Sequence, residues 1–546
     1  MRRYDPRASA RVILTILLVL GILPAMACNL SLGDQTPTPE PAEALRQTLQ
    51  ALSLPSPTPG PVLIATETSP APTEPEVVNT ELPPPAEVLP TIPAAPAGLF
   101  PTLTPLPLEE PALGDSYAYT VRWGDTVEGV ALRFMVEPAV IRTQTGDIPG
   151  YLNPGSALVI PRRLAYTTLP YPLLPDSELV YSPSALGFDL EQFIQQAGGF
   201  LSTYSEEVGG ELLSGAQAIQ RVADELSVNP RLLLAMLEFR SGWVYGQPPS
   251  VSALIYPIGF YVPDRKGLYE EIKITATQLN KGYYGWRQGT ELHVIYPDER
   301  ALRISPDLNA GTASLQRLFG MFFTKTEDWE NALYGRQSFP VLYQKMYGDP
   351  WKRAAAVEPL LPPNLAQPSL ELPFLAGVRW KYTGGPHDAW NAGTPRGALD
   401  FAPPNGTDPI CLVSADWASA SAAGVIARSA QAAVALDLDG DGFEQTGWVL
   451  VYMHLAYSDR ISEGEKVALD DLLGHPSCEG GVATARHLHI ARKYNGEWLP
   501  AVGPVPFVLG GWAAQPSENN YRGALEKDGR LLYPSLYGES TSYITR

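Results

Sequence analysis

The histidines of this chain are few and strongly clustered. The 546 residues contain six histidines, and five of them follow residue 386. Two stand in the triplet His487-Leu488-His489, whose apolar surroundings predict a strand. Because alternate side chains of a strand share a face, His487 and His489 are expected to point to the same side. Imidazole is a common metal ligand and proton carrier, so the cluster predicts metal or acid–base chemistry.

Three further residues extend this cluster. His454 ends the apolar run 448–453, which predicts another strand, His387 lies in a Gly-Pro-His segment, and Asp400 begins Asp-Phe-Ala-Pro-Pro. Imidazole and carboxylate suit Zn²⁺, and a catalytic zinc site uses three protein ligands and keeps a fourth position for water. Iron or copper would accept the same ligands, but a hydrolytic zinc site is commoner outside the cell. We interpret His475 as structural.

Four segments in this order resemble the lysostaphin and LytM family of zinc endopeptidases. They are Gly385-Pro386-His387, Asp400-Phe401-Ala402-Pro403, Tyr452-Met453-His454-Leu455 and His487-Leu488-His489. Most members have a ligand histidine four residues before the aspartate, where this chain has Arg396. The β-lytic branch instead has Gly-(Pro/Ala)-His thirteen residues before it, which is the interval from His387 to Asp400. The resemblance covers about residues 373–510.

The resemblance implies a site with ligands and proton carriers in separate positions. Zn²⁺ would be held by His387, Asp400 and His489, with His454 and His487 beside the water on the metal. Zinc lowers the pKa of such a water toward about 7. One histidine would take the proton and the other would stabilise the oxyanion, and the sequence does not assign which does which.

The first residues predict export. Four arginines among the first eleven residues precede the apolar run Val12–Pro24 and the small-residue triplet Ala25-Met26-Ala27. Residues 1–27 are therefore expected to be a signal peptide. Cys28 follows directly, which resembles a lipoprotein signal cut before a lipidated cysteine. The triplet would also suit ordinary signal cleavage. An uncleaved membrane helix is the other alternative, but the apolar run is a little shorter than the about 20 residues that a span needs.

Residues 28–112 are rich in Pro, Thr, Ala and Glu. Arg46 is the only basic residue between Thr36 and Pro111. Such a segment buries too little apolar surface to offset chain entropy, so it predicts an extended, disordered linker. After a lipid anchor, this linker would let the following domains reach from the membrane to the cell wall.

Residues 117–163 predict a small βααβ module. Its expected elements are a strand near Tyr119, helices over 127–134 and 138–143, and a strand over 157–161. The segments Tyr119-Thr120-Val121, Gly124-Asp125-Thr126 and Leu158-Val159-Ile160-Pro161 resemble a LysM module, which implies binding of N-acetylglucosamine chains. The matching positions are Trp123, Gly124, Asp125, Thr126, Ile148, Pro149, Gly150 and Tyr151. The alternative is a module of this fold without glycan affinity.

Residues 190–350 predict a mainly α, lysozyme-like domain. The stretch 232–243 faintly resembles the catalytic helix of lytic transglycosylases, in which a glutamate precedes Ser-Gly-aromatic. Here Arg240 precedes Ser241, and arginine cannot donate the proton because it stays charged. Glu238 stands two residues earlier, about 200° around a helix. The domain is therefore interpreted as degenerate, with glycan cleavage through Glu238 as the alternative.

The remaining cysteines predict a disulfide. The chain has three cysteines, and lipidation of Cys28 leaves Cys411 and Cys478. One pair in an exported protein favours a bridge over two unpaired thiols.

An aspartate-rich segment suggests a second cation. Asp437, Asp439 and Asp441 alternate around glycines and resemble a Ca²⁺ loop. A polar hairpin turn between two strands explains the pattern equally well.

The sequence as a whole predicts a multidomain envelope protein. After the linker come the module, the helical domain, a mainly β antiparallel metallopeptidase domain over 373–512, and an extension over 513–546. The net charge of −19 argues against nucleic-acid partners. We expect a zinc endopeptidase that binds peptidoglycan glycan and peptide, attached to the membrane by its lipid. The alternatives are a non-catalytic wall-binding scaffold and a bifunctional hydrolase that also uses Glu238.

Overall fold

A computed structural model describes residues 116–143, 152–404 and 411–546 of the chain. The expected signal peptide, Cys28, the linker 28–112 and the segment Ile148–Tyr151 lie outside these residues. Among the described residues, no helix combines the length and apolar character that crossing a bilayer requires.

The described residues of the small module form three strands and one α-helix. Its strand order is β1-β3-β2, with both pairs antiparallel. The elements are β1 Ser116–Thr120, α3 Val127–Phe134, β2 Arg142–Thr143 and β3 Ala157–Pro161. The expected second helix over 138–143 is wrong. A single 3₁₀ turn, Pro138–Val140, begins at the proline, and the chain then enters β2 because Ile141 and Thr143 are β-branched and favour extended backbone.

The region expected to be mainly helical is helical. Its helices are α4 Leu190–Ala197, α5 Gly215–Leu226, α6 Pro230–Ser241, α7 Val251–Ile255, α8 Leu268–Gln288, α9 Ala310–Gly320, α10 Thr326–Tyr334, α11 Phe339–Tyr347 and α12 Pro350–Val357. Two hairpins join them, β4 Ser205–Val208 with β5 Glu211–Ser214, and β6 His293–Ile295 with β7 Ala301–Arg303. We call residues 176–357 the helical domain.

Helix α8 is the longest helix described and was not indicated by the sequence pattern. It spans 21 residues and packs against α5 and α9. Its buried face carries Tyr283, Tyr284 and Trp286, which have modest helix propensity and blur the apolar periodicity. The close contact with α9 depends on Gly282, because a Cβ there would lie 2.8 Å from Ser314 Cα.

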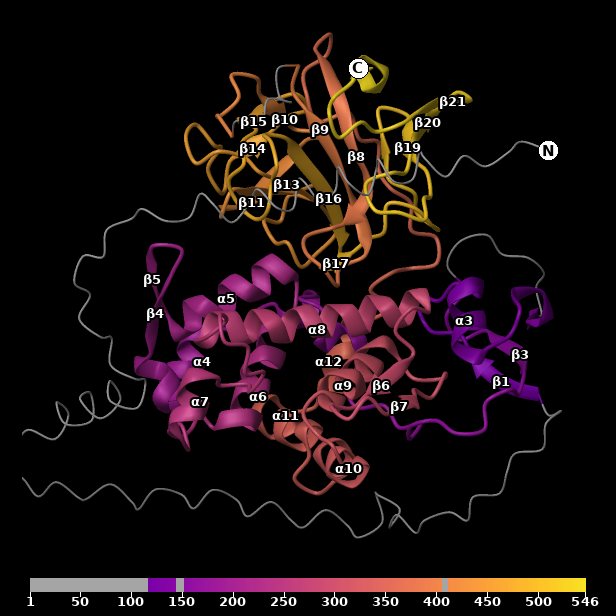
Figure 1. Cartoon of the computed structure of the whole chain (residues 1–546), viewed down its shortest axis with the longest axis vertical. Helices are drawn as coiled ribbons and strands as arrows, with labels where there is room; N and C mark the ends of the chain where they lie inside the picture. Colours follow the sequence, from indigo (N-terminus) through magenta and orange to yellow (C-terminus); the bar gives the residue numbers. More distant parts are fainter. Residues whose placement is uncertain (1–115, 144–151, 405–410) are drawn as a thin grey trace, which may run out of the picture. The chain divides into compact units, whose positions relative to one another are not determined.

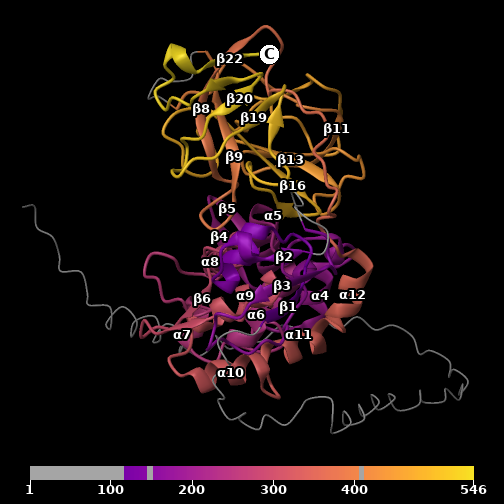
Figure 2. The same ribbon diagram turned by 90° about the vertical axis from the view of Figure 1, so that its right-hand side faces the viewer.

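The C-terminal part, which we call the β-domain (residues 370–546), is built on one antiparallel sheet (Figures 1 and 2). The strand order is β14-β11-β12-β13-β16-β9-β8-β22, with β17 paired to β16. The strands are β8 Arg379–Asp388, β9 Arg396–Ala402, β11 Gly424–Ala430, β12 Ala433–Asp437, β13 Trp448–Met453, β14 Lys466–Val467, β16 Leu488–Tyr494, β17 Glu497–Trp498 and β22 Tyr543–Thr545. One face buries large side chains such as Tyr452 and Ile490, and the other carries smaller ones such as Val451 and Ala491.

The last 34 residues are part of this domain, unlike the expected extension over 513–546. Strand β22 pairs with β8 along the edge of the sheet. A second sheet contains β18 Val508–Leu509, β19 Trp512–Ala514, β20 Leu525–Lys527 and β21 Arg530–Leu532. Leu525, Leu532 and Ile544 are buried in the core of the β-domain. The strands are two or three residues long, too short for an alternating pattern in the sequence.

A buried ion cluster stabilises the large sheet of the β-domain, through Arg428 in β11 and Lys493 in β16. Glu444 lies between Arg428 and Lys493 and accepts hydrogen bonds from both. Burial alone would raise the pKa of Glu444, but the two cations lower it from 4.5 to about 2. The carboxylate is therefore charged in the folded state well below the pH at which it would be protonated in the unfolded chain.

Replacing Glu444 by Gln is expected to destabilise the protein in a pH-dependent way. A pKa of about 2 in the folded state, against 4.5 otherwise, corresponds to about 3 kcal/mol. Because the folded pKa is depressed, this contribution is present above about pH 4.5 and is lost as the pH falls toward 2. Urea unfolding should show the destabilisation of Glu444→Gln at pH 7 and little of it near pH 2. Equal losses at both pH values contradict the ion-pair account, and the exposed Glu463→Gln serves as the control.

Candidate metal centre

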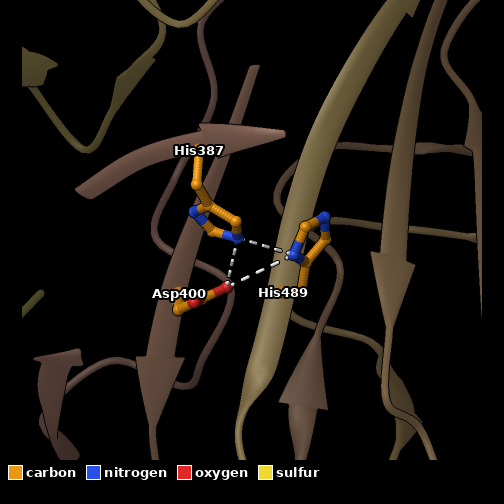
Figure 3. A group of neighbouring side chains, drawn as sticks. All are labelled: His387, Asp400 and His489. Atoms are coloured by element: carbon orange, nitrogen blue, oxygen red, sulfur yellow. Dashed lines mark hydrogen bonds and ion pairs between the residues drawn. The ribbon is translucent and has the colours of Figure 1, made fainter. Parts of the chain in front are cut away.

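Three neighbouring strands bring the predicted ligands together (Figure 3). His387 lies near the end of β8, Asp400 in β9 and His489 in β16. His489 stands directly opposite Asp400 in the β16–β9 pairing. Strands β8 and β9 pair with a register shift, which places Gly384 opposite Asp400. A Cβ at Gly384 would lie 2.4 Å from Asp400 Oδ2, so this position leaves room for the carboxylate only as glycine.

The three side chains converge on one point inside the domain. His387 Nε2 and His489 Nδ1 are 3.0 Å apart, and each lies 3.3 Å from Asp400 Oδ1. The three residues are only 3–6% exposed. No side chain or backbone group of the described chain donates a hydrogen bond to Asp400 Oδ1.

The hydrogen bonds behind the rings assign their tautomers. His387 Nδ1 lies 2.8 Å from Gly385 O, and His489 Nε2 lies 2.9 Å from Ala389 O. A carbonyl oxygen only accepts, so each of these nitrogens carries the proton. In the neutral rings, the nitrogens that face each other therefore both present lone pairs, beside a carboxylate oxygen. Three electron-pair donors in contact, with no proton between them, favour a bound cation.

The donor set fits zinc. Two ligands at 2.0–2.1 Å from a tetrahedral zinc lie about 3.3 Å apart, and the three distances here are 3.0, 3.3 and 3.3 Å. Burial alone would raise the pKa of Asp400, but His387 and His487 hold it well below its usual range. The carboxylate is therefore ionised, as a metal ligand must be.

His454 and His487 stand beside this group without joining it. Their ring centroids are 4.4 Å apart, and His487 Nε2 lies 3.9 Å from Asp400 Oδ1. The His454 ring lies 6.1 Å from that of His489. Among the described residues, His387, Asp400 and His489 lie close enough to share one metal ion. Neither His454 nor His487 belongs to this group.

The two outer histidines also have defined tautomers. His454 Nδ1 lies 2.9 Å from Glu479 O, and His487 Nδ1 lies 2.8 Å from Ala485 O. Each Nδ1 therefore carries the proton and each Nε2 has a free lone pair. Burial, together with His487 and His489, lowers the pKa of His454 to about 3. His454 is thus neutral at physiological pH.

The segment Ser477–Cys478 contacts both outer histidines and carries the predicted disulfide. His454 follows β13 with a left-handed φ of 63°, and its carbonyl accepts a hydrogen bond from Ser477 N. Ser477 O accepts in turn from His487 N. The disulfide Cys411–Cys478 is confirmed. The disulfide therefore restrains Ser477, whose backbone hydrogen bonds hold His454 and His487.

Reducing this disulfide is expected to destabilise the β-domain. The cysteines are 67 residues apart, and the chain-entropy model gives about 4 kcal/mol for a loop of that size. Calorimetry with and without reductant should show a lower melting temperature for the β-domain, while the module, which has no cysteine, is unaffected directly. Two reactive thiols from Cys411 and Cys478 in the denatured, unreduced protein would contradict the bridge.

Tyr521 belongs to the site and was missed in the sequence. Its ring stacks on His387 with centroids 4.1 Å apart and remains 42% exposed. Its carbonyl accepts from Gly385 N and its amide donates to Pro386 O. A Cβ at Gly385 would lie 2.3 Å from Gly523 O, so the two segments approach closely only with glycine there. Nothing in the local sequence marks this tyrosine, because its partner lies 134 residues earlier.

The first predicted glycan-binding loop packs against the helical domain. The Arg287 guanidinium lies 4.2 Å from the centre of the Trp123 ring, and Trp123 Nε1 donates to Glu358 Oε2. Asp125 is buried and pairs with Arg133, while Thr126 caps α3. Gly124 is buried as well. Glycan binding at these positions stays a prediction, and Arg287 covers part of the Trp123 ring.

Glu238 has a structural contact. Its carboxylate accepts hydrogen bonds from the backbone amides of Val244 and Tyr245, at 2.9 and 3.2 Å. It thereby holds the turn that follows α6. Arg240 instead donates to Ile258 O. Acid catalysis by Glu238 stays untested, and these bonds explain its presence without it.

The aspartate-rich segment forms the turn between β12 and β13. The carboxylates of Asp437, Asp439 and Asp441 offer oxygens within 4.8 Å of one another. Asp437 accepts from the amides of Asp439 and Gly442, so the turn itself uses part of this charge. Calcium binding here stays a prediction. His475 contacts Asp416 O and Trp417, apart from the metal group.

Comparisons with known proteins give partial matches. Residues 172–363 match the family model described as LasA, N-terminal domain. A search of curated proteins found no match. The M23 metalloprotease pseudoalterin from the deep sea is 22% identical over 31% of this chain and 96% of its own, with a TM-score of 0.26.

Two further solved structures are similar over part of the chain. The catalytic domain of lysostaphin from Staphylococcus simulans is 22% identical over 23% of this chain and 89% of its own, with a TM-score of 0.16. A zinc-containing peptidase from Vibrio cholerae is 15% identical over 26% of this chain and 41% of its own, with a TM-score of 0.19. These scores are too low to carry a functional argument, so function rests on the site.

Proposed function

We propose that this chain is a zinc-dependent endopeptidase that binds peptidoglycan and hydrolyses peptide bonds in its crosslinks. One observation carries the proposal. Two neutral imidazoles and an ionised carboxylate point their lone pairs at one buried spot, and two more imidazoles with free Nε2 atoms stand beside it. A structural zinc site has no use for the second pair.

The residues of the chain divide the chemistry between them. His387, Asp400 and His489 would hold zinc, which supplies an activated water and polarises the peptide carbonyl. His454 and His487, with rings 4.4 Å apart, both lie next to the ligand group. One Nε2 accepts the proton of the attacking water, and the other ring, once it has taken a proton from solvent at Nε2, donates a hydrogen bond to the carbonyl oxygen as charge develops there.

Tyr521 would help to shape the open side of the site. Its ring covers the outer face of His387 and leaves 42% of the residue in contact with solvent. It restricts water on that side and offers an aromatic surface to a bound peptide. We place the protein in the cell envelope, tethered through lipid on Cys28.

The proposal is tested by digestion of purified peptidoglycan with the full chain. New amino groups should appear with zinc present, disappear on chelation and return when zinc is restored. A protein that binds zinc but releases no amino groups would instead be the non-catalytic wall-binding scaffold. His475→Ala is the matched control, because it removes a histidine of the same domain that lies outside the site.

A further inference from the structure

The loop that joins the two ligand strands of the metal centre rests on the helical domain. Residues 389–394 connect β8 to β9 and contact the middle of α8. Asn391 Nδ2 donates to Thr277 Oγ1 over 3.1 Å. A Cβ at Gly393 would lie 2.8 Å from Thr277 O and 3.2 Å from Lys281 N, so the loop backbone lies directly on the helix.

The loop is braced internally. Ala389 N donates to Pro395 O over 2.9 Å, which closes its base. Thr394 Oγ1 donates to Asn391 O and accepts from Trp390 N. These bonds cross the loop and connect Asn391, through Thr394, to Trp390, the neighbour of Ala389.

The other side of this loop sets a metal ligand. The carbonyl of Ala389, which is fully buried, accepts the hydrogen bond from His489 Nε2. This bond fixes the ring orientation of His489 and keeps the lone pair of Nδ1 directed at His387 and Asp400. Loss of such a partner behind a ligating imidazole typically lowers metal affinity by about 10–100-fold.

Helix α8 is hydrogen-bonded to β17, the strand that pairs with the strand carrying His489. The Tyr284 hydroxyl accepts a hydrogen bond from Trp498 N, and the Tyr283 hydroxyl donates to Glu497 Oε2. Trp498 and Glu497 form β17. Strand β17 pairs with β16. The helix therefore contacts the ligand loop at its middle, and β17, the neighbour of the ligand strand, nearer its C-terminal end.

We propose that helix α8 positions the zinc ligand His489 through the loop 389–394, with Thr277 and Asn391 as positioning residues. The inference rests on the proposed zinc site. It assigns the helical domain an indirect part in metal binding, along the path from Thr277 by Asn391 and Ala389 to His489.

The test measures zinc affinity of the full chain by competition with a chelator. Thr277→Val removes the hydrogen-bond acceptor and keeps the side-chain volume, and Asn391→Ala removes the donor. Each should raise the zinc Kd by about fivefold, less than loss of a direct partner because the residues act one step further out. The double variant should bind zinc no more weakly than the single variants, because both substitutions remove the same hydrogen bond.

Ser227→Ala is the matched control. Ser227 Oγ donates to Gly496 O over 2.6 Å, so it also joins the helical domain to the β-domain but contacts the turn between β16 and β17. Its zinc Kd should equal that of the wild type even if its melting temperature falls. Unchanged affinity in Thr277→Val, or equal weakening in Ser227→Ala, overturns the inference. Absence of zinc binding in the wild type would instead overturn the proposed function.

Discussion

Replacing His387 by Ala is expected to remove most of the zinc, from about one ion per chain. The substitution takes away one of three ligands, so affinity should fall by more than the about 10–100-fold that loss of an outer partner costs. The remaining donors, His489 and Asp400, leave the carboxylate buried and only partly compensated. Metal analysis after dialysis against a weak chelator measures the loss.

Arg396→Ala is the control for this experiment. Arg396 stands four residues before Asp400. Most members of the family that the motifs resemble have a metal-binding histidine at this position. Here it is exposed and donates to the carbonyls of Ser517 and Glu518. Its replacement should leave zinc in place. Full zinc in His387→Ala would show that the ligand assignment is wrong.

Replacing His454 by Ala is expected to abolish peptide cleavage while zinc stays bound. His454 contributes no ligand atom to the group of three, so metal content should match the wild type. Loss of a proton-transferring side chain typically costs about 10²–10⁴-fold in rate. Cleavage of a crosslinked peptide by the zinc-loaded proteins gives the ratio, with His475→Ala retaining activity. Wild-type cleavage by His454→Ala contradicts the proposed mechanism.

The ligand assignment came from the resemblance of four short motifs to a known family, and each motif is local in the sequence. His487 and His489 share a short motif, His454 ends a plainly apolar strand, and the interval from His387 to Asp400 is distinctive. The structure brings all five side chains together, as expected. The disulfide followed from the cysteine count together with the predicted export and the predicted lipidation of Cys28, although its support of the outer histidines did not.

The parts that escaped prediction depend on contacts between distant segments. Tyr521 reaches His387 only because two glycine-containing segments lie against each other. The contact of Asn391 with Thr277 joins residues 114 positions apart. Strand β22 has three residues and gains its stability from the edge of β8. Such contacts leave no periodic pattern in a single sequence.

The most direct test of the account is identification of the products released from purified peptidoglycan. Mass spectrometry after digestion with the zinc-loaded protein should find peptides with newly freed amino and carboxyl ends on intact glycan strands. His454→Ala should release none of them. Fragments with cleaved glycan and intact crosslinks would contradict the account and identify the helical domain, through Glu238, as the active part.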